Sequence, residues 1–100
     1  MIKYKIDDSD KYRIYYKDTE LTNIRTDSNG ECNIGTISSF IPLNTTYITA
    51  QIKSANTGSG VLRIEPGLPS APTTSNVWII GTVNKTYSMI VVRAFYYNFN

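Results

Sequence analysis

Five side chains in the last forty residues or so carry groups suited to holding a ligand. Trp78 is the only tryptophan, and Arg63 and Glu65 are alternate residues of one expected strand. Asn76 comes just before the tryptophan, and Arg93 is the one charged residue in a long apolar stretch. An indole can stack on the apolar face of a sugar ring and still offer one N–H donor. These five residues are the candidate ligand-binding residues.

Two of the five have alternative interpretations that the sequence leaves open. Trp78 stands between Val77 and Ile79, so it either fills the core or forms a stacking platform. Arg93, among so many apolar residues, must be paired, must reach a protein interface or must await an anion. A salt bridge from Arg93 to Glu65 or to a partner chain is as consistent with the sequence as a ligand contact.

The sequence offers little for catalysis or metal binding. It has no histidine and a single cysteine, Cys32, which removes Ser-His and Cys-His nucleophile pairs and a structural zinc site. Asp18 and Glu20 would share a strand face as a glycosidase pair does, but nothing else builds a cleft around them. The aspartates at 7, 8 and 10 lack the Gly and closing Glu of a calcium loop. We expect a protein that is not an enzyme, with no catalytic residue, metal or cofactor.

Strand signals recur along the chain and helix signals are nearly absent. Asn29-Gly30 is typical of a tight hairpin turn, and residues 66–76 form a long loop with three of the four prolines. The expected strands are residues 2–6, 12–17, 21–24, 32–41, 47–53, 61–65, 77–82 and 87–97. This pattern predicts an all-β fold without significant helix: an antiparallel Greek-key β-barrel or a β-sandwich of about eight short strands.

The last expected strand, residues 87–97, is apolar on both faces. Ile90, Val92 and Ala94 alternate on one face. A strand in a small antiparallel domain normally has one face in water, so a second copy of the chain is the simplest cover for the other face. The predicted oligomer interface is Met89, Val91, Phe95 and Tyr97. Because Arg93 lies on the same face, we expect the interface and the ligand site to be neighbours.

Size and charge narrow the choice of partners. We expect the 100 residues to form one domain, with residues 1–30 either part of its head or an attachment or edge segment. The net charge of +2 is too small to indicate nucleic acid. Beyond residue 31 only five residues are charged, a surface suited to neutral polymers or isolated anionic groups. No apolar run approaches the ~18 residues of a membrane span, and no signal peptide is apparent.

From about residue 31 the chain resembles the C-terminal head domain of receptor-binding proteins of tailed phages of Gram-positive bacteria, of the lactococcal siphophage type. The resemblance is carried by Gly35-Thr36-Ile37-Ser38-Ser39-Phe40-Ile41-Pro42-Leu43, by the long Pro/Ser loop, and by the two apolar stretches at residues 76–82 and 91–97. It is a similarity of pattern and strand order. The first thirty residues do not resemble the interlaced neck of those proteins.

The resemblance implies an adhesin head that binds host cell-wall saccharide, with or without phosphate, near the clefts of a homotrimer. It further implies a place in the virion, at the tail tip or baseplate, after synthesis in the host cytoplasm, and contacts with other tail or baseplate proteins. In that family an aromatic ring, an arginine and acidic or histidine groups hold the sugar, and this sequence departs from it in having no histidine. The alternative is a structural or adaptor module that docks other virion proteins.

Overall fold

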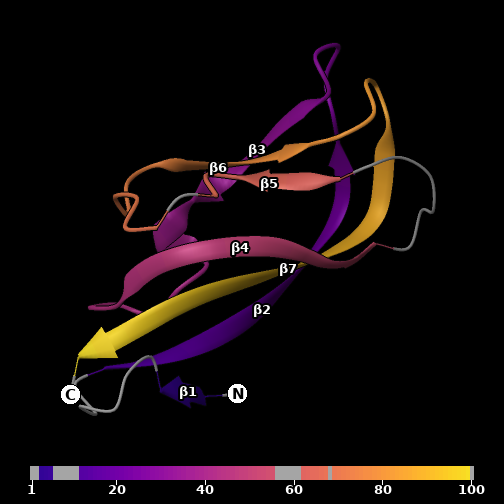
Figure 1. Cartoon of the computed structure of the whole chain (residues 1–100). Coiled ribbons are helices and arrows are strands. Elements are labelled where there is room, and N and C mark those ends of the chain that lie inside the picture. The colour runs from indigo at the N-terminus through magenta and orange to yellow at the C-terminus, as the bar shows by residue number, and fades with distance from the viewer. Residues whose placement is uncertain (1–2, 6–11, 56–61, 68, 100) are drawn as a thin grey trace.

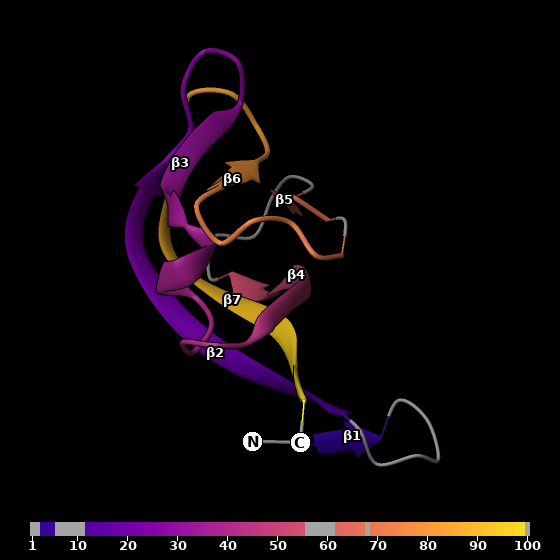
Figure 2. The same cartoon turned by 90° about the vertical axis from the view of Figure 1, so that its left-hand side faces the viewer.

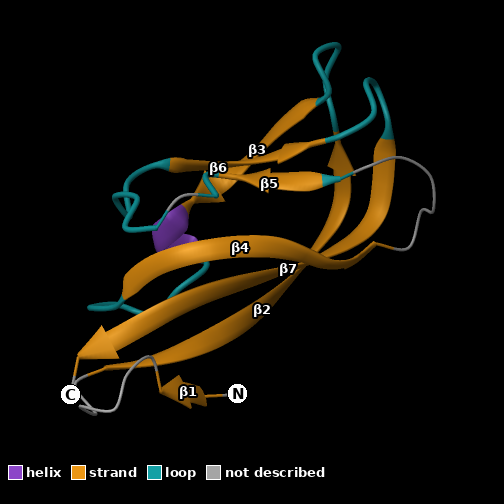
Figure 3. Cartoon of the chain, in the orientation of Figure 1, coloured by secondary structure: helices purple, strands orange, loops and turns teal. Residues whose placement is uncertain are grey.

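The structure is a computed structural model that describes residues 3–5, 12–55, 62–67 and 69–99. A single turn of 3-10 helix, η1 (Ile37–Ser39), is its one helical element in these ranges, and no helix there is long and apolar enough to cross a bilayer (Figure 3). The aspartates at 7, 8 and 10 lie outside the described residues. The strands are β1 (Lys3–Lys5), β2 (Tyr12–Arg25), β3 (Glu31–Thr36), β4 (Thr46–Ala55), β5 (Arg63–Glu65), β6 (Asn76–Ile80) and β7 (Thr86–Phe99).

The strands form two antiparallel sheets that lie in two layers (Figure 1). The larger sheet has the order β1-β2-β7-β4 and the smaller has the order β3-β6-β5. β2 and β7 pair in one unbroken register from Tyr12↔Phe99 to Arg25↔Thr86. Figure 2 shows these two strands curving around one side of the smaller sheet. The chain changes sheet in four connections: β2 to β3, β3 to β4, β4 to β5, and β6 to β7.

The all-β prediction is confirmed, but the barrel and the strand count are wrong. The described strands number seven rather than about eight, and the two sheets stay separate, so no barrel closes among them. β2 and β7 are also not short, since each has 14 residues. The sequence predicts a break between two strands at Asp18 and Glu20, after residue 17 and before residue 21. Both are exposed residues of one continuous strand, which its pairing with β7 holds extended.

The expected strand over residues 32–41 ends early, at Thr36. A 3-10 turn follows, in which the Phe40 N–H donates to the Ile37 carbonyl over 2.8 Å. Ile37, Phe40 and Ile41 are all buried. A straight strand sends neighbouring side chains to opposite faces, so it could not bury both Phe40 and Ile41. The turn brings all three into the core.

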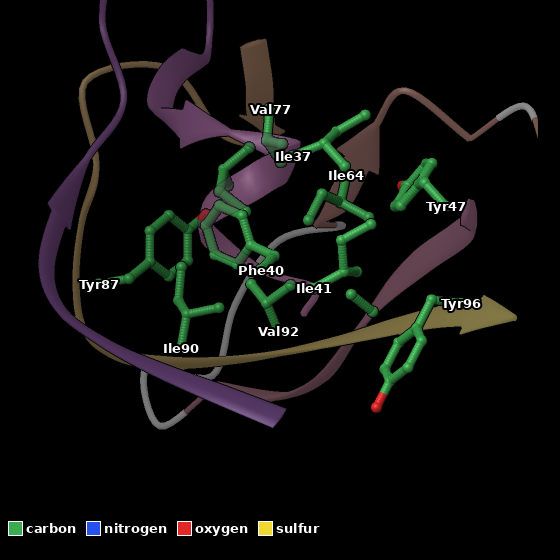
Figure 4. Close-up of a cluster of buried hydrophobic side chains, with 12 residues drawn as sticks. Ile37, Phe40, Ile41, Tyr47, Ile64, Val77, Tyr87, Ile90, Val92 and Tyr96 are labelled. Carbon is green, nitrogen blue, oxygen red and sulfur yellow. The ribbon is translucent and has the colours of Figure 1, made fainter. Parts of the chain in front are cut away.

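The core lies between the inner faces of the two sheets (Figure 4). β7 contributes more of it than any other element, because this strand is central in its sheet and its even-numbered residues from 90 to 96 face inward. Burial of each large apolar side chain stabilises the fold by roughly 1.5–3 kcal/mol. The buried hydrophobic residues are Ile37, Phe40, Ile41, Tyr47, Ile64, Val77, Ile79, Tyr87, Ile90, Val92, Ala94 and Tyr96.

The inward face of β2 and β7 changes by one residue near Asn23. Leu21 and Ile24 both pack on the core, and so do Ile90 and Tyr87 opposite them, although each pair is three residues apart. Asn23 has a φ of 54°, in the left-handed region where Asn is among the best-tolerated residues. The strands therefore turn their apolar side toward the smaller sheet without losing register.

Two of the crossing connections are bonded to each other at Thr26, the buried polar residue of the described core. Its N–H donates to the Lys85 carbonyl over 2.9 Å. Its Oγ1 donates to the Thr82 carbonyl and accepts from the Lys85 N–H. The Gly81 N–H donates to Gly30, which has a φ of 78°. The Gly30 N–H also donates to the Asp27 carbonyl over 3.0 Å, so the turn predicted at Asn29-Gly30 is present. The predicted hairpin is wrong, because β2 and β3 belong to different sheets.

We expect Thr26→Val to lower the free energy of unfolding by about 2 kcal/mol, because valine has the same shape but leaves the Lys85 N–H and the Thr82 carbonyl without this partner. Urea denaturation of both proteins measures the change. Thr22→Val is the matched control, since Thr22 is exposed on β2, the strand that leads into Thr26, and this variant should change stability by no more than about 0.5 kcal/mol. Equal losses of unfolding free energy in the two variants would contradict a stabilising role for the hydrogen bonds at Thr26.

Candidate ligand-binding face

Trp78 lies on the outer face of the smaller sheet. Val77 and Ile79 are buried, whereas Asn76 is exposed and Trp78 and Ile80 are half-buried. This alternation is that of a strand with one face on the core. The core interpretation of Trp78 is therefore wrong: its side chain is not among those that build or pack against the core of the described residues.

Strand register sets the neighbours of the indole. β6 is the central strand, so Trp78 has Asn33 of β3 opposite on one side and Glu65 of β5 opposite on the other. Directly opposed residues have Cβ atoms about 4.5–5.5 Å apart. Arg63 is opposite Ile80 on the same face. The structure thus brings together four of the five predicted ligand residues, and adds Asn33.

Arg63 and Glu65 form an exposed ion pair beside Trp78. The Arg63 Nη2 and Nε atoms lie 3.1 and 3.3 Å from the same carboxylate oxygen, Oε1. Such a pair, with side chains 65% and 51% exposed, contributes little to stability. Within the described residues the second oxygen, Oε2, has no hydrogen bond, so it remains able to accept one from a ligand.

Asn33 presents a hydrogen-bond donor on the other flank of Trp78, opposite the acceptor of Glu65. Its Oδ1 accepts from the Gly35 N–H over 2.9 Å, which fixes the side chain against its own strand. The amide NH2 group has no hydrogen bond to another described residue, and the residue is exposed. Sequence reasoning missed Asn33, although its position between the inward-facing Cys32 and Ile34 was a signal that it faces outward.

An open hollow of about 550 Å³ borders this face along β5. Arg63 and Glu65 line it together with Ile64, Pro66 and Gly67. The Tyr47 hydroxyl donates to the Pro66 carbonyl, which ties this segment to β4. Burial raises the pKa of the Tyr47 hydroxyl to about 12, so the donor keeps its proton at all physiological pH values.

Arg93 does not join this group. It lies on β7, on the outer face of the larger sheet, where it makes two hydrogen bonds of 2.9 and 3.0 Å to the Asp18 carboxylate. Its guanidinium carbon is 3.9 Å from the centre of the Tyr16 ring, and Lys53 also reaches Asp18 at 3.4 Å. Because the sheets pack through their inner faces, Arg93 and Trp78 lie on opposite sides of the molecule. Arg93 and Trp78 therefore cannot belong to one ligand site on this chain, and the expected closeness of interface and ligand site stays a prediction.

The residues predicted as an oligomer interface do share that outer face. Met89, Val91, Phe95 and Tyr97 alternate with the buried residues of β7, and all four are half-buried. Beside them Ile14, Ile48, Thr49 and Phe95 line a shallow, mostly apolar hollow of about 330 Å³. The Tyr16 ring meets Phe95 edge to face at 5.9 Å. Sequence reasoning missed the contributions of β2 and β4.

The Asp18 and Glu20 pair differs from a glycosidase pair in its electrostatics. Both residues are on the outer face of β2. The hydrogen bonds from Arg93 lower the pKa of the Asp18 carboxyl and are the largest effect on it. Burial, the next largest, acts in the opposite direction, and the charge of Arg93 and the contact with Lys53 lower the pKa further. A glycosidase general acid needs a raised pKa instead. The structural role of Asp18 is an ion pair.

We expect the stabilisation from Asp18 to depend on pH. A lowered pKa in the folded state means that the contribution is present above the ordinary value of 3.8 and is lost as the pH falls through the folded value. Asp18→Asn should therefore lower the free energy of unfolding by about 1 kcal/mol near neutral pH and by less at about pH 2. Urea denaturation at both pH values measures it. Glu20→Gln is the control, because Glu20 is a nearby carboxylate with no ion pair to another described residue. A pH-independent loss in Asp18→Asn would contradict the assignment.

Comparison with known proteins does not assign the chain to a family. No protein-family model, curated protein or solved structure matches the chain.

Proposed function

We propose that the chain is a non-catalytic adhesin head domain of a phage tail or baseplate that binds host cell-wall saccharide. The sequence resemblance to phage receptor-binding heads supplies the biological setting. The outer face of the smaller sheet supplies the binding surface, with Trp78 as the platform and Asn33, Glu65, Arg63 and Asn76 around it. Arg93 is left out of this site, because it is bonded to Asp18 on the other side of the molecule.

The position of Trp78 carries the proposal. A large aromatic side chain that is only half-buried on the outer face of a sheet costs free energy through its contact with water unless something covers it. Here a donor and an acceptor without partners in the described chain flank the ring. An aromatic surface with hydrogen-bonding groups beside it suits a sugar, which has apolar C–H faces and hydroxyl edges.

We expect Trp78→Ala to weaken binding to Gram-positive cell-wall polysaccharide on the order of tenfold or more, because the stacking surface is lost. Titration of immobilised polysaccharide measures the affinity, and ligand-induced quenching of the single tryptophan in the wild-type protein reports the same event. Circular dichroism and the melting temperature verify that the variant is folded. Undiminished binding by a folded Trp78→Ala protein would rule out this face.

The outer face of the larger sheet favours self-association as part of the same proposal. The resemblance implies a homotrimer. The half-buried row of Met89, Val91, Phe95 and Tyr97 and the adjoining hollow provide apolar side chains on both sides of the Arg93–Asp18 ion pair, and protein interfaces are enriched in such aromatic, methionine and arginine side chains. Because this surface faces away from Trp78, each copy would keep its own sugar site exposed to the host.

The same surface supports the second candidate function, a structural or adaptor module that docks other virion proteins. The two functions are separated by a crossed experiment. Phe95→Ser is expected to shift the mass in solution toward the monomer and leave binding of a short oligosaccharide intact. Trp78→Ala is expected to leave the mass in solution unchanged and to weaken binding of the oligosaccharide. A short ligand is needed because loss of oligomers lowers avidity for a polymer. The adaptor function would be favoured if the wild-type protein is monomeric, binds no glycan and binds another tail protein.

A further inference from the structure

We propose that the Trp78 face selects an uncharged polysaccharide rather than a phosphate-bearing one, and contacts more than one sugar unit. This inference rests on the proposed function and names the ligand class for the same site. It follows from the charges on the face, from the groups left without partners, and from the hollow beside the platform.

The charge balance of the face disfavours an anionic ligand. The described charged residues on this face are two acids, Glu31 and Glu65, and one cation, Arg63. The strand register places all three on the same side of the sheet as Trp78. The only guanidinium of the face is directed toward Glu65 at 3.1 Å. Phosphate recognition in proteins uses cationic groups that converge on the anion. A phosphate here would have to displace Glu65 and would meet a net negative surface.

The unpartnered groups match a hydroxyl-bearing, uncharged ring. The Asn33 amide offers N–H donors on one flank of the indole, and the Glu65 Oε2 atom offers an acceptor on the other. A sugar hydroxyl donates and accepts, so neighbouring hydroxyls can use both flanks while the C–H face of the ring covers Trp78. These interactions need no charge on the ligand.

The shape of the face indicates a polymer. The indole stands in the middle of a three-stranded sheet, and the hollow of about 550 Å³ starts at Arg63 and Glu65, the side chains next to the platform. A chain that stacks one unit on Trp78 can continue over β5 into the hollow. A longer oligosaccharide should therefore bind more tightly than its monosaccharide.

The test uses cell-wall polysaccharide from a Gram-positive host, intact and after chemical removal of its phosphate groups. We expect the dephosphorylated form to bind the wild-type protein at least as tightly as the intact form, and its affinity to change by less than about threefold between 0.05 and 0.5 M salt, roughly the range over which phosphate contacts are screened. Fragments of the dephosphorylated chain should gain on the order of tenfold in affinity from one unit to three. A loss of binding on dephosphorylation, or on added salt, would overturn the inference while leaving the proposed function intact; equal binding of one and three units would overturn the polymer part.

A conservative variant separates the donor from the fold. Asn33→Asp keeps an oxygen for the Gly35 N–H but removes the amide donors, so affinity for the dephosphorylated chain should fall about tenfold. Gln51→Glu makes the same amide-to-acid change on the outer face of the larger sheet and serves as the control. A folded Asn33→Asp protein with full affinity would contradict the assignment of Asn33. Failure of both polysaccharide forms to bind the wild-type protein would refute the proposed function itself.

Discussion

The hydrogen bonds at Thr26 fix the position of the smaller sheet relative to the larger one. The chain leaves the larger sheet through residues 26–30 and returns to it through residues 81–85, and one buried threonine bonds the two crossings together. Backbone groups at such crossings have no ladder partner, and leaving them buried and unpaired would be costly. With the crossings fixed, β2 and β7 stay adjacent and the smaller sheet is held over their inner face.

This arrangement gives the molecule two outer faces with different chemistry. The face of the smaller sheet is polar around one indole, whereas the face of the larger sheet combines apolar side chains with the ion pairs of Asp18. Because the inner faces meet in the core, a contact on one outer face does not cover the other. The domain can therefore be attached through one side and bind through the opposite side.

The alternation of apolar residues along a strand was enough to predict which of its side chains are buried. The alternation in residues 87–97 assigned Ile90, Val92 and Ala94 to one face, and they are buried. Pairing between distant strands was beyond the sequence: it decided that Arg93 meets Asp18, 75 residues away, and that Asn33 flanks Trp78. The turn at Gly30 was recognised from its residue types, but the sheet to which each flanking strand belongs depends on the whole topology.

The pairing of β2 with β7 also determines when the fold can form. These strands come from opposite ends of the described chain, yet they make the most extensive strand pair and carry much of the core. Closing so large a loop costs chain entropy before any contact repays it. During synthesis the apolar residues of β4 and β6 must wait until β7 has emerged, so this domain is expected to fold late and slowly, and to expose its core to other chains in the meantime.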